Sequence, residues 1–354
     1  MCEGPARVPS FSGPSRPGAD YTGKVAPEPL HPLLVVIGPT ASGKSHLALA
    51  LARRFQGEIV NCDSLQIYRG MDIGTAKTPA AERSGVPHHL FDFLAPGETY
   101  NAGQFAADAR RAITGITGRG RLAVLAGGTG FYLRALLQGL ADGPVRDEAL
   151  RERLSGREIR RPGSLHRLLA RLDGPTAARI HPNDRHKTIR ALEICLLARR
   201  PASQVFEEGS RPLEGYRVLQ LGLDPPRPLL HQRIAARTEA MFAQGLLEEV
   251  RSLLQQGVPP TAKAFESIGY KEALACLRGE LTRAAALELT TIATRQYAKR
   301  QMTWFRRDPG VRWLAGFGDD PRTLALAEEI AGCWLAEFTT VTQTTPPPAP
   351  YYIP

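Results

Sequence analysis

The sequence predicts an α/β fold: a parallel sheet flanked by helices, with an all-helical insertion between its two halves. Short apolar, β-branched runs recur along the chain, and helical patterns separate them. Such alternation is typical of a parallel sheet covered on both faces. Between residues 140 and 205 the strand signals vanish and arginine-rich helical stretches replace them. The expected strands are LLVVIG (33–38), EIVNCD (58–63), RLAVLAGG (121–128) and YRVLQLGL (216–223).

Helical patterns follow these strands in order. Residues 45–55 place two leucines and two alanines on one side of a helix, and a second helix is expected over 102–117. The chain again has a helical pattern from 228 to 304. Within it, residues 229–257 predict one continuous amphipathic helix that stops at a glycine.

Composition divides the chain into five segments. The ends are proline-rich and lack a sustained apolar period, so they are expected to be disordered. The insertion carries +6 of the net charge of +10. The predicted segments are a disordered extension (1–32), the first part of the core (33–139), a basic helical insertion (140–205), the second part of the core (206–338) and a disordered tail (339–354).

The charge and the cysteines narrow the class of protein. A pI near 9.6 favours a polyanionic partner such as nucleic acid, although a basic proteome gives the same bias. The five cysteines are scattered without a C-x-x-C pair, so neither a zinc site nor a disulfide framework is indicated. No apolar run approaches the roughly 20 residues that span a bilayer, and no signal peptide is evident. A cytoplasmic protein is therefore expected.

A glycine-rich loop stands between the first strand and the first helix. Gly38-Pro-Thr-Ala-Ser-Gly-Lys-Ser45 matches G-x-x-x-x-G-K-[ST], the phosphate-binding loop of P-loop NTPase-like folds. Backbone N–H groups and the helix N-terminus would hold a phosphate chain. Lys44 would neutralise phosphate oxygens, and Ser45 would help to hold Mg²⁺. The predicted diphosphate-binding residues are Gly38, Thr40, Ala41, Ser42, Gly43, Lys44 and Ser45.

Two further features qualify this loop. The strand at 121–128 ends in glycines without the carboxylate of an ordinary P-loop NTPase, so the loop is expected to hold a diphosphate other than that of a hydrolysed nucleotide. Whether the loop also binds ATP stays open.

Asp63 directly follows the second strand, at the edge where parallel sheets bind ligands. There it can accept a proton, ligate Mg²⁺ or cap a turn.

Six blocks in order resemble the tRNA isopentenyltransferase (dimethylallyltransferase) family of the bacterial type, over residues 33 to 315. The C-terminal Cys/His zinc module of some eukaryotic relatives is missing, and Phe265-Glu266 departs from the family's small or nonpolar residues before SIGY. The blocks are GPTASGKS, DSLQIYRGMDIGTAK (63–77), AGGTGFYLRALLQGL (126–140), ARIHPNDRHKTIRALEI (178–194), SIGYKEAL (267–274) and TRQYAKRQMTWFR (294–306).

The resemblance implies a reaction and its residues. A monomeric enzyme would transfer a dimethylallyl group from dimethylallyl diphosphate to N6 of adenosine 37, beside the anticodon, in tRNAs reading codons that begin with U. Mg²⁺ would assist, Asp63 would be the general base, Thr129 would orient the amine, and Arg237 would clamp the diphosphate. The implied tRNA contacts are Asp63, Ser64, Leu65, Gln66, Thr129, Arg151, His186, Lys187, Thr188, Ile189, Arg190, Glu266, Ser267, Ile268, Gly269, Tyr270 and Lys271.

Three alternatives stay open. A small-molecule kinase would share the loop but consume ATP. An isopentenyltransferase acting on free ADP or ATP would share the chemistry without needing the basic insertion. An RNA-binding protein with a relict loop would not need Lys44, Ser45, Asp63 and Arg237 intact. Among the remaining residues, His88-His89 is expected in a loop, and Trp304 in the core rather than on a base.

Overall fold

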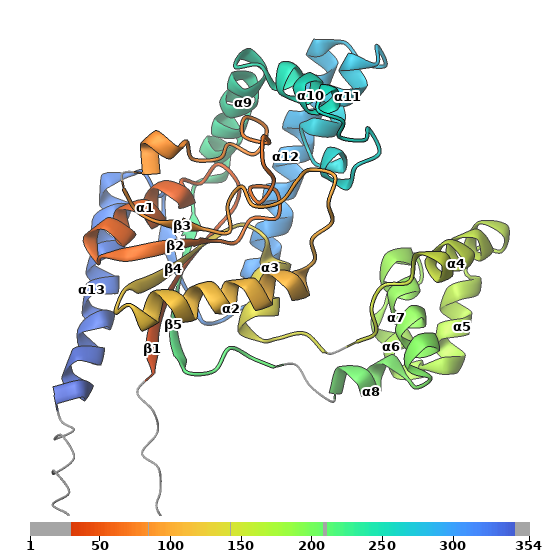
Figure 1. The fold of residues 1–354 in the computed structure, drawn as a ribbon, viewed down its shortest axis with the longest axis horizontal. Helices are drawn as coiled ribbons and strands as arrows, with labels where there is room; N and C mark the ends of the chain where they lie inside the picture. The colour runs from red at the N-terminus through yellow and green to blue at the C-terminus, as the bar shows by residue number, and fades with distance from the viewer. Residues whose placement is uncertain (1–29, 84, 142, 208–210, 344–354) are drawn as a thin grey trace, which may run out of the picture.

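The computed structural model describes residues 30–343 except 84, 142 and 208–210 (Figure 1). Within them the strands form one parallel sheet in the order β3-β2-β4-β1-β5-β6, which confirms the predicted fold class. In the central strand β1, the residues from Leu33 to Ile37 are apolar and buried, as a middle strand requires. The strands are β1 His31–Ile37, β2 Gly57–Asn61, β3 His88–His89, β4 Leu122–Gly127, β5 Tyr216–Asp224 and β6 Val311–Ala315.

Helices cover both faces of the sheet. Alternate residues of β1 point in opposite directions, so Leu34 and Val36 pack with α1 and α13, and Leu33 and Val35 pack with α2 and α3. These helices are α1 Lys44–Arg54, α2 Ala102–Gly118, α3 Gly130–Leu137 and α13 Pro321–Gln343.

A second helical layer lies beyond the carboxyl ends of the strands (Figure 1). Two of its helices fall where one continuous helix was predicted over 229–257. That prediction was wrong because Gly245, at φ 104°, breaks the helix and starts the next one. The layer consists of α9 Arg227–Ala243, α10 Leu246–Gln255, η2 Lys263–Glu266, α11 Tyr270–Leu277 and α12 Arg283–Phe305. The remaining short helix, η1, spans Ala80–Arg83.

Five helices between α3 and β5 form a separate helical lobe at one side of the sheet (Figure 1). Asp147, Asp173 and Asp184 cap three of these helices through their side chains. The lobe has an apolar core of its own, which includes Leu165, Leu169 and Leu192. Its helices are α4 Glu148–Arg160, α5 Ser164–Leu172, α6 Gly174–Arg179, α7 Arg185–Ala198 and α8 Ala202–Glu207.

Other expectations need correction. His88 and His89 form strand β3 instead of a loop, because they pair with β2 and His89 Nε2 contacts Glu58 Oε2 at 2.7 Å. At the ends of the chain, β1 already begins at His31. Helix α13 continues to Gln343 because no proline interrupts it before that point. Residues 1–29 and 344–354 of the predicted extension and tail lie outside the described residues. In the described part of the chain, no helix has the length and hydropathy to cross a membrane.

Candidate active site

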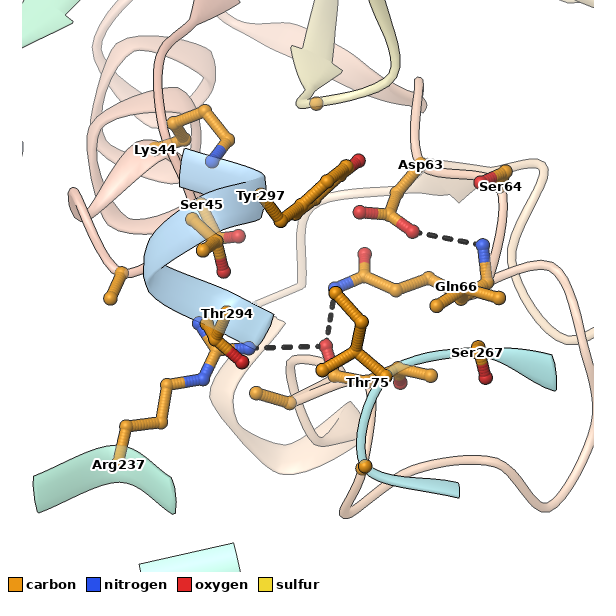
Figure 2. Close-up of a pocket in the computed structure, with 18 of the residues that line it drawn as sticks. Lys44, Ser45, Asp63, Ser64, Gln66, Thr75, Arg237, Ser267, Thr294 and Tyr297 are labelled. Atoms are coloured by element: carbon orange, nitrogen blue, oxygen red, sulfur yellow. Dashed lines mark hydrogen bonds between the residues drawn. The ribbon is translucent and has the colours of Figure 1, made fainter. Parts of the chain in front are cut away.

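A cavity of about 350 Å³ opens at the carboxyl edge of the sheet (Figure 2). Its walls come from several parts of the sequence, including the phosphate loop, the segment 63–78 after β2, helix α9, residues 266–269 before α11, and helix α12. The parallel topology brings the ends of β1, β2 and β4 to this edge, so loops distant in sequence face one space.

The phosphate loop makes a tight turn with two residues in the left-handed region, an alanine and a glycine. Ala41 and Gly43 have φ angles of 63° and 86°. A Cβ at Gly43 would lie 2.9 Å from the backbone nitrogen of Gly318, so the position has no room for a side chain. Gly43 also precedes α1, and no side chain caps that helix. The first N–H groups of α1 are therefore free to bind an anion.

Two cations enter the cavity without a carboxylate partner among the described residues. Lys44 Nζ donates to the carbonyl of Pro39 at 2.7 Å, and Arg237 Nη2 donates to that of Thr75 at 3.3 Å. Burial lowers the pKa of Lys44 to about 8, with Asp63 opposing the shift and Arg237 adding to it. Burial also lowers the pKa of Arg237, again against Asp63. An anionic ligand would relieve this cost of desolvation.

Asp63 faces these cations across the cavity. Its Oδ1 accepts the backbone N–H of Leu65 at 2.9 Å, while Asn61 holds the backbone of Asp63 from the other side. The other carboxylate oxygen points toward Tyr297 in Figure 2. Burial raises the pKa of Tyr297, and the charge of Asp63 raises it further. One oxygen of Asp63 thus shapes the turn, and the other is directed at the ligand space.

The segment after β4 packs too tightly for side chains at its glycines. A Cβ at Gly127 would lie 2.1 Å from the carbonyl oxygen of Cys62. Thr129 follows, and its hydroxyl accepts the N–H of Ser64 at 3.1 Å. Thr129 therefore stands behind Ser64, and it is not among the residues that line the cavity.

Helix α12 contributes residues that sequence reasoning missed. Gln301 accepts the N–H of Thr40 at 2.8 Å and donates to the carbonyl of Gly128 at 2.8 Å, which ties the phosphate loop to the end of β4. Thr294 and Tyr297 line the cavity from the same helix. Their spacing of three and four residues places all three side chains on one helix face, and this periodicity was the available signal.

Most of the implied tRNA contacts fall into two groups. One group lies in the cavity wall, and the other lies in the helical lobe, with Lys187 73% exposed in its side chain. The cavity group is Asp63, Ser64, Leu65, Gln66, Glu266, Ser267, Ile268 and Gly269. The lobe group is Arg151, His186, Lys187 and Arg190. Lys271 is exposed at the start of α11.

Three of the implied contacts have buried side chains. Tyr270 is 0% exposed, and its hydroxyl donates to Glu249. Thr188 and Ile189 are 2% and 7% exposed, because they occupy the face of α7 that packs into the lobe. A tRNA contact at these three positions therefore stays a prediction.

The cavity fits Mg²⁺ only as an ion that arrives with a phosphate ligand. Within the described ranges, no group of three or more His, Cys, Asp or Glu side chains could hold a metal by itself. The Ser45 hydroxyl is exposed next to Lys44 at the start of α1. Mg²⁺ keeps several waters and commonly binds through one or two protein oxygens plus phosphate oxygens. Ser45 fits that pattern of ligands.

Sheet, loop and cavity define a P-loop-like α/β protein. The sequence model of the IPP transferase family matches residues 66–308. The chain belongs to that family, and it is a prenyl-transferring enzyme.

Similar proteins cover more than four-fifths of the chain. The tRNA dimethylallyltransferase of Solibacter usitatus is 57% identical over 82% of this chain and 94% of that protein. The one from Koribacter versatilis is 52% identical over 84% and 97%. Among solved structures, the tRNA isopentenylpyrophosphate transferase of Bacillus halodurans has a TM-score of 0.66 at 36% identity, over 88% of this chain and 99% of that chain. A eukaryotic dimethylallyltransferase acting on tRNA has a TM-score of 0.72 at 30% identity, over 87% and 80%.

Proposed function

We propose that the enzyme transfers a dimethylallyl group from dimethylallyl diphosphate to N6 of adenosine 37, next to the anticodon, in tRNAs that read codons beginning with U. The products are N6-isopentenyladenosine and diphosphate. The enzyme acts as a cytoplasmic monomer. The names and the extent of the similar proteins support the tRNA substrate. The observation that carries the proposal is that Lys44, Arg237 and Asp63 converge in one cavity.

The donor end of the reaction needs a site for a departing diphosphate. The C1–O bond of the donor breaks as N6 of adenine forms its bond to C1, and an allylic carbon tolerates the positive charge that develops. The barrier therefore depends on stabilising the negative charge of the leaving group. Lys44, Arg237 and the free N–H groups at the start of α1 are suited to this role. When bound, Mg²⁺ neutralises more of that charge, held by Ser45.

The acceptor end needs a base. The lone pair of an exocyclic amine on adenine is delocalised, so the amine is a weak nucleophile. Removing a proton as the C–N bond forms accelerates such a step by roughly 10²–10⁴-fold. The free carboxylate oxygen of Asp63 accepts that proton, and Thr129, whose hydroxyl accepts the N–H of Ser64, orients the amine. Ser64, Leu65 and Gln66 line the path of adenine.

The adenine must leave its stack to reach the cavity. Extruding a base costs a few kcal/mol, which contacts with RNA phosphates can offset. The helical lobe is the proposed source of such contacts, through Arg151, His186, Lys187 and Arg190. Glu266, Ser267, Ile268, Gly269 and Lys271 form the proposed contacts at the cavity mouth.

Nucleoside analysis tests the proposal. Unmodified tRNA is incubated with the protein, Mg²⁺ and dimethylallyl diphosphate, then digested and separated. Isopentenyladenosine is expected, and sequencing of the modified fragment should place it at position 37. Parallel reactions contain ADP, ATP or a tRNA with guanosine at position 37. Modification of the free nucleotides in place of tRNA would contradict the proposed acceptor.

A further inference from the structure

The cavity loop, residues 71–77, is held from outside by helix α10. Glu249 on α10 accepts the backbone N–H groups of residues 72, 73 and 74 at 2.9, 2.8 and 3.3 Å. The hydroxyl of Tyr270 donates to the same carboxylate. An ionised carboxylate has two oxygens that only accept, whereas an amide presents one acceptor and one donor group. Only the carboxylate can therefore satisfy all four donors.

Thr75 is the next residue of the cavity loop, and its carbonyl contacts two side chains that line the cavity. The carbonyl oxygen of Thr75 accepts Gln66 Nε2 at 3.2 Å and Arg237 Nη2 at 3.3 Å (Figure 2). Gln66 and Arg237 come from different segments, and both line the cavity. One carbonyl thus orients two side chains that face the ligand space.

Packing leaves the cavity loop little freedom to move independently of Glu249. A Cβ at Gly74 would lie 2.4 Å from the ring of Tyr270, which is itself 0% exposed. Lys77 closes the other end of the loop by donating to the carbonyl of Tyr68 at 2.8 Å and to Asp72 at 2.6 Å. A shift at residues 72–74 must therefore move the carbonyl of Thr75.

We propose that Glu249 is a positioning residue that sets the geometry of both substrate sites through the cavity loop. Its carboxylate fixes residues 72–74, and the carbonyl of Thr75 then holds Arg237 toward the diphosphate and Gln66 toward the acceptor base. This inference rests on the proposed function, because that function assigns Arg237 and Gln66 to the two substrates. Glu249 itself touches neither substrate.

Glu249→Gln tests the proposal with a probe that needs no catalysis. Calorimetry with inorganic diphosphate should show a Kd raised about tenfold, and single-turnover transfer should slow by about 10- to 100-fold, as for a displaced site. Affinity for tRNA should stay within about twofold, because the lobe contacts are untouched. Tyr270→Phe removes only one of the four donors, so a rise of about threefold in the diphosphate Kd is expected.

A neighbouring residue supplies the matched control. Glu248 is exposed and, among the described residues, pairs only with Arg251 at 3.6 Å, so Glu248→Gln should leave the diphosphate Kd unchanged. A diphosphate Kd that is equally unchanged in Glu249→Gln and Tyr270→Phe would overturn the proposal. If Glu249→Gln does not fold, an unchanged Kd in Tyr270→Phe alone counts against it.

A double-mutant cycle separates positioning from general loss of stability. Arg237→Lys keeps a charge but loses the planar fork that reaches both Thr75 and the ligand. If Glu249 acts through Arg237, its substitution should raise the diphosphate Kd much less in the Arg237→Lys background than in the parent. If Glu249→Gln raises the diphosphate Kd by the same factor in both backgrounds, Glu249 does not act through Arg237. Absence of isopentenyladenosine with the unsubstituted enzyme would instead defeat the proposed function, which keeps the two failures distinct.

Discussion

The cations of the cavity and the arginines of the helical lobe have different partners. Lys44 and Arg237 donate to backbone carbonyls, and no carboxylate in the described ranges pairs with either. Carbonyl groups carry no net charge, so the positive charge of the cavity stays available for a ligand. Desolvation makes that charge unfavourable until an anion binds, which the lowered pKa of Lys44 reflects.

In the helical lobe, by contrast, two arginines pair with a buried carboxylate of the lobe itself. Arg151 and Arg190 both pair with Glu193, at 3.1 and 2.6 Å, and Glu193 is 0% exposed. Glu193 also accepts the N–H of Asp147 at 2.8 Å, where the chain enters the lobe. The number of arginines in a region therefore does not measure its capacity to bind phosphate. The comparison predicts that changes in the cavity alter chemistry and donor binding, whereas changes in the lobe alter stability and RNA affinity.

Asp63→Asn should have the largest effect, because it removes the proposed base without removing the turn. An asparagine oxygen can still accept the N–H of Leu65, so stability should change little. The rate of single-turnover transfer should fall by about 10²–10⁴-fold, with KM for both substrates changed much less. The reaction is followed at saturating substrates over a range of Mg²⁺. A rate that excess Mg²⁺ restores would assign Asp63 to the metal.

Lys44→Ala should follow, with a fall in transfer rate of about 10²–10³-fold, as for the loss of one group that stabilises a developing anion. Affinity for tRNA should remain nearly intact, since Lys44 lies inside the cavity and away from the lobe. Filter binding of tRNA and the transfer rate are measured on the same preparation. Normal donor turnover in this variant would disprove the role of the phosphate loop.

More of the fold than of the candidate site could be predicted from the sequence. The α/β class and four strands followed from apolar runs and the glycine loop, because buried parallel strands show a strong local pattern. Strand β3 has only two residues, His88 and His89, and its pairing depends on β2 across the sheet. No local pattern reports such a contact.

The candidate site likewise contains residues with a local sequence signature and residues whose role depends on the folded chain. The phosphate loop and Asp63 have local signatures, so their positions at the cavity could be anticipated. Tyr270 belongs to a recognisable block, yet sequence alone could not show that its ring is buried against Gly74. Gln301 acts on the phosphate loop from 261 residues away, a relation that only the folded chain reveals.

Glu193→Gln tests the opposite side of the comparison. It leaves Arg151 and Arg190 without their shared carboxylate, so the lobe should lose about 2 kcal/mol of stability. This loss is smaller than the roughly 3–5 kcal/mol expected when one partner of a fully buried ion pair is removed, because both arginines keep some contact with water. Denaturant unfolding reports the loss, and the diphosphate Kd should not change. The exposed Glu152 on α4 provides the control, Glu152→Gln, with no loss expected.

The pH dependence of diphosphate binding should report Lys44. Its pKa in the free enzyme is about 8, so the ammonium loses its proton as the pH rises through that value, and affinity falls. Between pH 7 and pH 9 the diphosphate Kd should rise about tenfold beyond the change caused by the ligand's own ionisation. In Lys44→Arg the guanidinium stays charged, so this extra rise should disappear. A rise of equal size in Lys44→Arg would show that another group titrates.

Lys187→Ala should have the smallest effect, and it tests whether the exposed charge of the lobe contacts RNA. The Lys187 side chain is 73% exposed and, within the described ranges, pairs only with Asp184 at 2.7 Å, so its charge is more accessible than that of Arg151 or Arg190. If it neutralises one phosphate, the slope of log affinity for tRNA against log salt should become shallower by about 0.7–0.9. Lys187→Arg should keep the slope. Asp184→Asn removes the competing carboxylate while preserving the helix cap, so tRNA affinity should rise slightly. An unchanged slope in Lys187→Ala would mean that this charge is only solvated, and that the lobe binds RNA through other residues.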